Sequence, residues 1–147
     1  MYDNLMKTFI VSYHDTTVSN GNYIPLTKVS EPPQLIFYPQ IKQYYTIIMF
    51  DLDAPSRLNP VNRSWLHWLI TNIYEDKLGT GEIIMNYQPP SPPYKSGNHR
   101  YIFILLEQTN RIIFTKISNR AKFDLEHFIN SYNLKPINLD YFVSFIY

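Results

Sequence analysis

The sequence contains no cysteine, which excludes disulfide bonds, thiolate metal sites and a cysteine nucleophile. Charge of one sign is not in excess either, because 13 Lys and Arg residues face 12 Asp and Glu residues, for a formal net charge of +1. No strong field is therefore present to attract nucleic acid. The start of the chain lacks the basic and apolar regions of a signal peptide, and the longest apolar runs are far shorter than a membrane span. We expect a soluble, cytoplasmic protein with no transmembrane segment and no nucleic-acid partner.

A chain of 147 residues is the size of one ordinary domain. Such a chain can bury roughly 70% of the surface that its unfolded form exposes. Hydrophobic residues make up 45% of the composition, which is typical of a globular protein. We therefore expect a single domain over residues 1–147. The abundance of Tyr, Ile and Asn is typical of an A+T-rich genome, either cellular or viral.

Short runs of β-branched and aromatic residues, separated by Pro and Asn, dominate the chain. The runs at 44–52, 65–74 and 101–106 are apolar at both parities, as strands buried on both faces are. Further runs predict strands at 8–13, 34–38, 112–115 and 139–146. The pattern predicts a mostly β protein, an antiparallel β-sandwich with few short helices.

One segment has the spacing of a helix, with apolar residues at i, i+3, i+4 and i+7, namely Leu125, Phe128, Ile129 and Tyr132. Asp124 stands at the N-cap position, and Phe123 is placed to contact Phe128 across the first turn. Asn133 and then Pro136 predict the end of the helix.

Four polar residues interrupt the apolar strands or end them: Asp51, Asp53, His67 and His99. By parity, the side chains expected to share a face are Asp51 with Asp53, Trp65 with His67 and Leu69, and His99 with Tyr101. Burying such polar groups costs free energy unless they are paired. We therefore expect Asp51 to hold one of the histidines.

Several interpretations of these four residues remain open from the residues alone. Two histidines with one or two aspartates could bind a metal ion, although no His-x-His or His-x₃-His spacing is present. A Ser-His-Asp triad would need a nucleophile, and neither Ser64 nor Ser91 lies in a Gly-x-Ser-x-Gly motif. An anion pocket would use the imidazoles and nearby N–H groups as donors to a phosphate or a carboxylate. Paired histidines with a purely structural role are the fourth interpretation.

The sequence at these positions resembles a known family. Residues 51–57 are Asp-Leu-Asp-Ala-Pro-Ser-Arg, residues 63–67 are Arg-Ser-Trp-Leu-His, and residues 97–101 are Gly-Asn-His-Arg-Tyr. These segments are similar in order and spacing to the Asp-Pro-Asp-x-Pro-Ser-Arg, Arg-Glu-Trp-x-His and Gly-x-His-Arg-Tyr motifs of the phosphatidylethanolamine-binding protein family. Tyr87 and the prolines at 92 and 93 fall where that family has a Tyr-x-Gly-x-Gly-Pro-Pro loop.

The resemblance implies a β-sandwich of the phosphatidylethanolamine-binding type, with one small anion pocket at a sheet edge. The family's polar pocket positions correspond to Asp51, Asp53, His67 and His99. Its wall positions correspond to Ala54, Pro55, Trp65, Tyr87, Pro92 and Tyr101, and Ser91 adds a hydroxyl at the mouth. The resemblance also implies a cis peptide bond between Arg63 and Ser64.

The sequence departs from the family's pattern in three places and at both ends. Leu52 replaces a proline, and Pro89 and Ser91 stand where the family has glycines. The chain begins later and stops sooner than other members, so that residues 140–147 overlap only the start of the family's C-terminal helix region. We expect this apolar end to pack on the body and to form a short flap near the pocket mouth.

The resemblance thus predicts a non-enzymatic binding protein without cofactor, metal or catalytic residues. Its ligand would be a small phosphate-bearing anion, such as the phosphoethanolamine head group of a phospholipid. We expect tighter binding at mildly acidic pH, because a charged imidazole attracts phosphate. The alternative is a protein-interaction regulator, since some relatives inhibit kinases in signalling or inhibit proteases, and others act as scaffolds.

Overall fold

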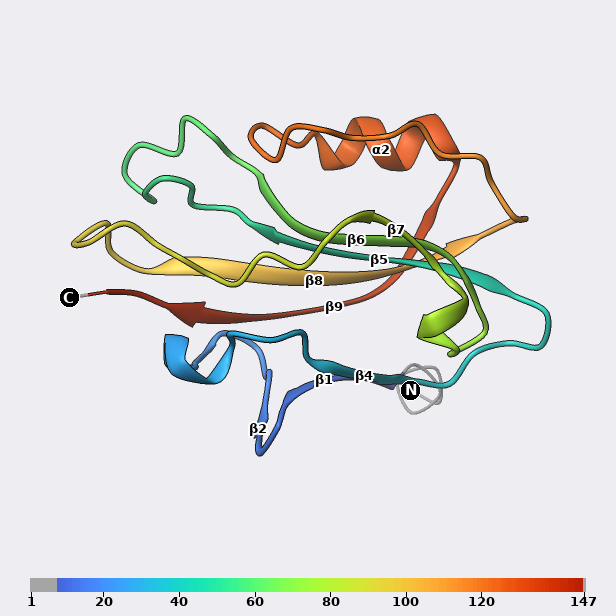
Figure 1. Cartoon of the computed structure of the whole chain (residues 1–147), viewed down its shortest axis with the longest axis horizontal. Helices are drawn as coiled ribbons and strands as arrows, with labels where there is room; N and C mark the ends of the chain where they lie inside the picture. The colour runs from blue at the N-terminus through green and yellow to red at the C-terminus, as the bar shows by residue number, and fades with distance from the viewer. Residues whose placement is uncertain (1–7, 147) are drawn as a thin grey trace.

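The structure is a computed structural model that describes residues 8–146, and it consists of two sheets and one α-helix (Figure 1). The larger sheet has six strands in the order β3-β9-β8-β5-β6-β7, and the smaller has three in the order β2-β1-β4. The strands of the larger sheet are β3 (Asn22–Tyr23), β5 (Tyr44–Asp51), β6 (Trp65–Tyr74), β7 (Glu82–Met85), β8 (His99–Gln108) and β9 (Lys135–Ser144). Those of the smaller sheet are β1 (Phe9–Tyr13), β2 (Thr16–Thr17) and β4 (Gln34–Phe37), and single 3₁₀ turns lie at Leu26–Lys28 and Leu78–Thr80.

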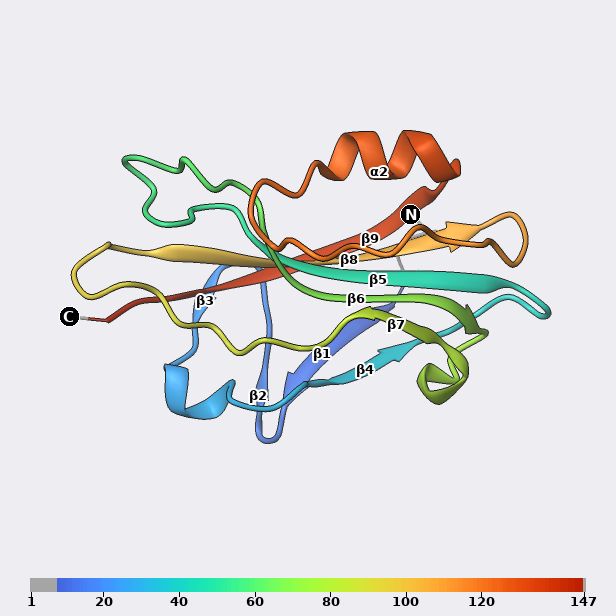
Figure 2. The same ribbon diagram turned by 45° about the horizontal axis from the view of Figure 1, so that its top comes forward.

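The six-stranded sheet is covered on both faces, and its central strands explain why. Strands β5, β6 and β8 are apolar at both parities, and nearly every residue of β5 and β6 is buried. The smaller sheet covers one face, whereas α2 (Leu125–Tyr132) lies over the other (Figure 2). All strand pairs are antiparallel except the short pairing of β3 with β9. The mostly β sandwich predicted from the sequence is confirmed.

Helix α2 begins and ends where the sequence predicts. The Asp124 carboxylate accepts a hydrogen bond of 3.0 Å from the His127 N–H, which satisfies a free donor of the first turn. The rings of Phe123 and Phe128 lie 5.5 Å apart, and Asn133 ends the helix in the left-handed conformation.

Residues 112–115 do not form the predicted strand. Both the N–H and the carbonyl of Ile112 are instead bonded to the side-chain amide of Asn72, at 2.9 and 2.7 Å. Phe114 then packs against Phe128 beneath α2. Hydrogen bonds to the buried Asn72 amide thus take the place of hydrogen bonds to a neighbouring strand. No local sequence pattern indicates this replacement.

The C-terminal segment is a strand inside the larger sheet, as the run at 139–146 predicts, so it does not overlap the start of a helix. A short flap at the very end near the cavity mouth stays a prediction, although the Lys95 N–H of the 86–98 loop donates to the Ile146 carbonyl at 3.2 Å. Strand β9 pairs with β8 along its length and with β3 at its end. Phe142 is fully buried, and its ring stacks on that of Tyr101 at 5.1 Å. Packing of this end on the body is confirmed for the described residues, whereas Tyr147 lies outside them. Within residues 8–146, no helix is both long and apolar enough to span a membrane, and the cytoplasmic location stays a prediction.

Candidate functional site

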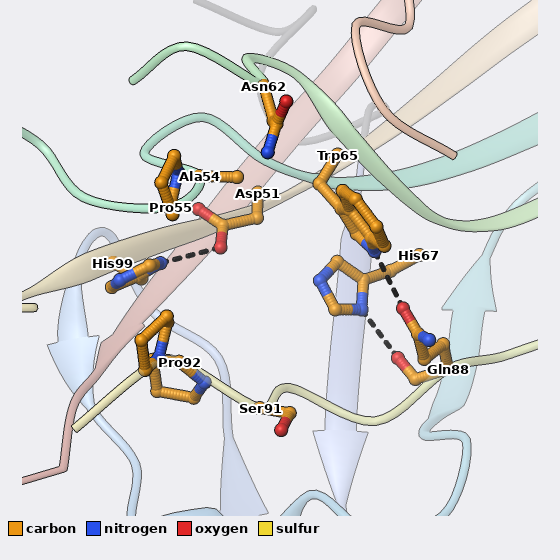
Figure 3. A pocket seen from close by; sticks show the side chains of 11 residues that line it. Asp51, Ala54, Pro55, Asn62, Trp65, His67, Gln88, Ser91, Pro92 and His99 are labelled. Atoms are coloured by element: carbon orange, nitrogen blue, oxygen red, sulfur yellow. Dashed lines mark hydrogen bonds and ion pairs between the residues drawn. The ribbon is translucent and has the colours of Figure 1, made fainter. Parts of the chain in front are cut away.

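The site lies at one end of the larger sheet, where β5 ends and both β6 and β8 begin (Figure 1). Antiparallel pairing brings these ends together, because Asp51 is opposite Trp65 on β6 and opposite Tyr101 on β8. The loops 52–64 and 86–98 extend from this end and enclose a cavity of about 270 Å³ (Figure 3). Its lining residues are Asp51, Ala54, Pro55, Asn62, Trp65, His67, Gln88, Ser91, Pro92, Pro93 and His99.

Most residues proposed from the sequence line this cavity, and three do not. The lining includes Asp51, Ala54, Pro55, Trp65, His67, Ser91, Pro92 and His99. Asp53, Tyr87 and Tyr101 do not line the cavity. Asp53 binds Arg100, whereas the two tyrosines pack behind the residues that line the cavity. The structure therefore brings His67 and His99 to one cavity, as expected, while the binding of a ligand by these residues stays a prediction.

A β-bulge at His67 directs this side chain toward the cavity. Met49 is opposite Trp68 and Phe50 is opposite Leu66, so that His67 is the extra residue of β6. Beyond the bulge the faces exchange, and Leu69 packs on the helix side of the sheet. The expectation that Trp65, His67 and Leu69 share one face is therefore wrong for Leu69.

Gln88 fixes the orientation of both β6 side chains at the site. The His67 Nδ1–H donates to the Gln88 carbonyl at 2.5 Å, and the Trp65 indole N–H donates to the Gln88 side-chain oxygen at 2.6 Å. Burial lowers the pKa of His67 below 6.5, and the favourable effects of the Gln88 carbonyl and the Asp51 charge do not offset it. His67 is therefore neutral near pH 7, and its unprotonated Nε2 faces the cavity (Figure 3).

His99 belongs to a chain of hydrogen bonds that crosses the wall of the cavity. Its Nδ1 lies 2.6 Å from an Asp51 carboxylate oxygen, and its Nε2 lies 2.8 Å from the Ser96 hydroxyl oxygen. Ser96 in turn donates to the Pro93 carbonyl at 2.6 Å. The network therefore anchors the turn at 93–96 to Asp51 through the imidazole of His99.

Two of the open interpretations can be compared with this geometry. Ser96, His99 and Asp51 lie in line as a hydrolytic triad would, but Ser96 does not line the cavity, and its hydroxyl also lies 2.6 Å from the Pro93 carbonyl. A metal would need several converging ligands, and no group of three His, Asp or Glu side chains suited to a metal occurs in the part of the chain that the structure describes.

Asp53 lies two residues beyond Asp51 but faces a different set of groups. Its carboxylate accepts two hydrogen bonds from the Arg100 guanidinium, at 2.8 and 2.9 Å, and one from the Arg100 N–H. Arg63 lies at 3.3 Å and Arg57 at 3.5 Å. Burial would raise the pKa of Asp53, but the hydrogen bonds and charge of Arg100 outweigh burial and lower the pKa below 3.8.

Tyr101 and Tyr87 form the support behind the cavity. The Tyr101 ring stacks on His99 at 6.1 Å and meets His67 edge-on at 5.4 Å, so it sets the distance between the imidazoles. Its buried hydroxyl has no hydrogen-bond partner in the structure. The Tyr87 hydroxyl donates to the Val29 carbonyl at 2.8 Å, which ties the 86–98 loop to the smaller sheet's side of the core.

The departures from the family's motifs are accommodated locally. The Leu52 N–H donates to the Arg100 carbonyl at 3.1 Å, a bond that a proline could not make. Neither Pro89 nor Ser91 has a positive φ, so glycine is not needed there, whereas Gly97 has φ 84° at the start of its motif. The peptide bond between Arg63 and Ser64 is cis, as the resemblance implies.

Sequence reasoning missed four residues of the site. Asn62 and Pro93 line the cavity, Gln88 holds two side chains, and Ser96 binds His99. Each stands within or beside a recognised motif but is a common loop residue, so that only its spatial position distinguishes it.

Comparisons with known proteins agree with this geometry. A model of the phosphatidylethanolamine-binding protein family matches residues 14–142. Protein TERMINAL FLOWER 1 of Arabidopsis thaliana is 34% identical over 127 residues, which cover 84% of this chain and 71% of that protein. A Drosophila melanogaster relative named for odorant binding is 31% identical over 132 residues, and the chain spans 63% of its length.

Solved structures show the same fold. The carboxypeptidase Y inhibitor, in complex with its cognate proteinase, superposes with a TM-score of 0.87 at 23% identity, over 97% of this chain and 84% of that one. A phosphatidylethanolamine-binding protein from Plasmodium vivax gives 0.82 at 20% identity, over 96% and 86%. With its two histidines, its Asp51 partner and a family match over most of its length, this chain belongs to the phosphatidylethanolamine-binding protein family.

Proposed function

We propose that this chain is a non-enzymatic binding protein whose cavity takes a small phosphate-bearing anion, such as the phosphoethanolamine head group of a phospholipid. The observation that carries the proposal is the free His67 Nε2, which faces the cavity between apolar walls. The Asn62 amide also points into this space (Figure 3). Such a space, with a few convergent polar groups, suits a small ligand.

The protonation of His67 defines which form of the ligand fits. Because Nδ1–H is committed to Gln88, Nε2 accepts a proton or a hydrogen bond from the ligand. A phosphate monoester in its singly charged form supplies that proton, whereas a fully ionised one requires His67 to take a proton from solution. In both cases binding takes up a proton at neutral pH. Affinity should therefore rise as the pH falls toward the lowered pKa of His67.

Titration calorimetry with phosphoethanolamine tests this proposal. Binding of the wild type should be tighter at about pH 6 than at about pH 7.5, and His67→Ala should lose about tenfold in affinity or more, as expected for a hydrogen bond to a charged group. His127→Ala, on the exposed side of α2, is the matched control and should bind like the wild type. Equal affinity of His67→Ala and the wild type at both pH values would overturn the proposal.

The second candidate function is regulation of a protein partner, as an inhibitor of a kinase or a protease or as a scaffold. It is supported by the fold shared with the carboxypeptidase Y inhibitor and by the exposed apolar side chains beside the cavity mouth. A purified partner that binds His67→Ala as well as the wild type would favour this function, because the cavity would then be dispensable.

A further inference from the structure

A second cavity lies at the end of the sandwich opposite the candidate site, where β4 ends and β5 begins (Figures 1 and 2). It has a volume of about 520 Å³. Both sheets contribute apolar walls to it, with Phe37 and Tyr38 at the end of β4, Leu105 on β8 and Ile137 on β9. We call this space the distal cleft. Its size and its mainly apolar walls are typical of sites for small ligands.

Two side chains of opposite charge line the distal cleft. Glu107, near the end of β8, and Lys135, at the start of β9, are directly opposite each other in the strand register. Opposite charges at such positions stabilise a sheet when they are in contact. Within residues 8–146, however, neither side chain takes part in an ion pair. Both charges are therefore available to a ligand.

Glu107 is a polar exception on the inner face of β8. Phe103 and Leu105 precede it at the same parity, and both belong to the core between the sheets. Burial raises the pKa of Tyr45, and the negative charge of Glu107 adds to this effect, which places the carboxylate near the Tyr45 hydroxyl. That hydroxyl accepts a hydrogen bond of 2.9 Å from the Gln40 N–H. A half-buried carboxylate at this position costs free energy unless a cation is paired with it.

We propose that the distal cleft binds a small zwitterion with an apolar side chain, of which an aromatic α-amino acid is the simplest. The ammonium group of the ligand pairs with Glu107, and its carboxylate pairs with Lys135. The ligand side chain packs against Phe37 and Tyr45, whose ring centroids are 5.1 Å apart, and Tyr38 adds a ring that is 71% exposed. The site is independent of the proposed function, because it shares no lining residue with the cavity at the other end.

The charges of the distal cleft favour a zwitterion over a ligand with one charge. A simple amine is attracted by Glu107 but repelled by Lys135, and a simple carboxylate meets the reverse arrangement. A zwitterion is attracted by both side chains. Phosphoethanolamine is also a zwitterion, but it has no apolar side chain for the walls, so it should be a poor ligand here.

Titration with phenylalanine, followed by NMR of the protein, tests the proposal. Phenylalanine amide keeps only the ammonium group and N-acetylphenylalanine keeps only the carboxylate, so they also stand for the first and last residues of a peptide. Each should bind about fivefold more weakly than phenylalanine or worse. Glu107→Gln and Lys135→Gln should each lower the affinity for phenylalanine about fivefold. Glu126→Gln and Lys116→Gln make the same charge changes at exposed positions outside the cleft, and they should leave the affinity unchanged.

Four results would overturn the proposal. The first is a wild type that does not bind phenylalanine, and the second is equal binding by the wild type, Glu107→Gln and Lys135→Gln. The third is phenylalanine amide that binds as tightly as phenylalanine, which would assign the cleft to cations or to the start of a peptide. The fourth is loss of phenylalanine binding in His67→Ala, which would place the amino acid in the other cavity. Glu107→Gln should bind phosphoethanolamine like the wild type, so each site can fail without the other.

Discussion

Asp51 and Asp53 are two residues apart, share a parity and are both buried, yet they meet opposite surroundings. Asp51 faces an imidazole and the cavity, whereas Asp53 faces guanidinium groups and is closed off from the cavity. An imidazole can exchange donor and acceptor roles, but a guanidinium only donates and keeps its charge. Asp51 therefore has a partner in the site whose hydrogen-bonding role can change, whereas Asp53 has partners that only donate and that hold the scaffold.

The turn after β5 causes this difference. The Asp53 N–H donates to an Asp51 carboxylate oxygen at 2.8 Å, which folds the chain back on itself. The Leu52 N–H then bonds to the Arg100 carbonyl, and the Asp53 side chain meets the Arg100 side chain beside it. Once the strand has ended, parity no longer determines the direction of a side chain.

The largest expected effect comes from removing the aromatic stack that supports His99, the partner of Asp51. Phe142→Ala should lower the free energy of unfolding by about 3–5 kcal/mol, because a fully buried ring is lost. Chemical denaturation measures this loss. Phe142 stacks on Tyr101, which stacks on His99, so the change should also weaken phosphoethanolamine binding. Phe142→Leu should be milder in both respects, and a full loss of stability without any loss of binding would contradict the support role.

Asp53→Asn should lower the stability of the fold more than the matched substitution Asp51→Asn does. An amide cannot satisfy the Arg100 guanidinium and N–H as a carboxylate does, and we expect a loss of about 3 kcal/mol. Arg57→Gln is the control and should lower the stability by less than about 1 kcal/mol, because the contact of Arg57 with Asp53 is long, at 3.5 Å, and the Arg57 side chain is half exposed. An equal cost for both variants would show that Asp53 is not held mainly by Arg100.

The pH dependence of stability should report Asp53. Its folded pKa lies below the value of 3.8 for the free side chain, so its contribution is full above that value and is lost as the pH falls through the folded pKa. Denaturation in urea at several pH values should therefore show the wild type and Asp53→Asn converging in acid. A stability difference that stays constant down to about pH 2 would contradict this linkage.

Ser96→Ala should have a smaller effect, because it removes one link of the Asp51 network. We expect a loss of about 1 kcal/mol in thermal or urea denaturation, the usual net contribution of a hydrogen bond. The turn at 93–96 should also exchange its amide hydrogens faster, since the bonds of the Ser96 hydroxyl to Pro93 and His99 are lost. Unchanged exchange would mean that the hydroxyl does not anchor this turn.

Asp51→Asn should have the smallest effect on stability, less than about 1 kcal/mol. The new amide N–H can donate to His99 Nδ1, and His99 Nε2–H can then donate to Ser96, so every bond is kept with a neutral ring. Urea denaturation measures this loss, and nitrogen NMR of the His99 ring should show the proton on Nε2 in this variant. A stability loss as large as that of Asp53→Asn would remove the distinction between the two carboxylates.

Long apolar runs and short motifs were the strongest signals in the sequence. Strand β6 has the predicted bounds, and β5 and β8 lie at the predicted places, because a run that is apolar at both parities is stable only inside a covered sheet. Strands β2 and β3, with two residues each, are too short to show any alternation. The run at 112–115 looked like a strand, and a single buried side chain, Asn72, gave it another structure.

The sequence by itself determined the central strands, the capped helix and the presence of Asp51, His67 and His99 in a largely apolar setting, because these depend on local pattern and on the cost of burying polar groups. Only the tertiary structure decided which polar groups meet. The bulge at His67 reorients that residue, the turn after Asp51 sends Asp53 to Arg100, and Gln88 and Ser96 reach their histidines from a loop without regular structure. These contacts join segments that are distant in the chain, so their geometry depends on the packing of whole elements and not on neighbouring residues.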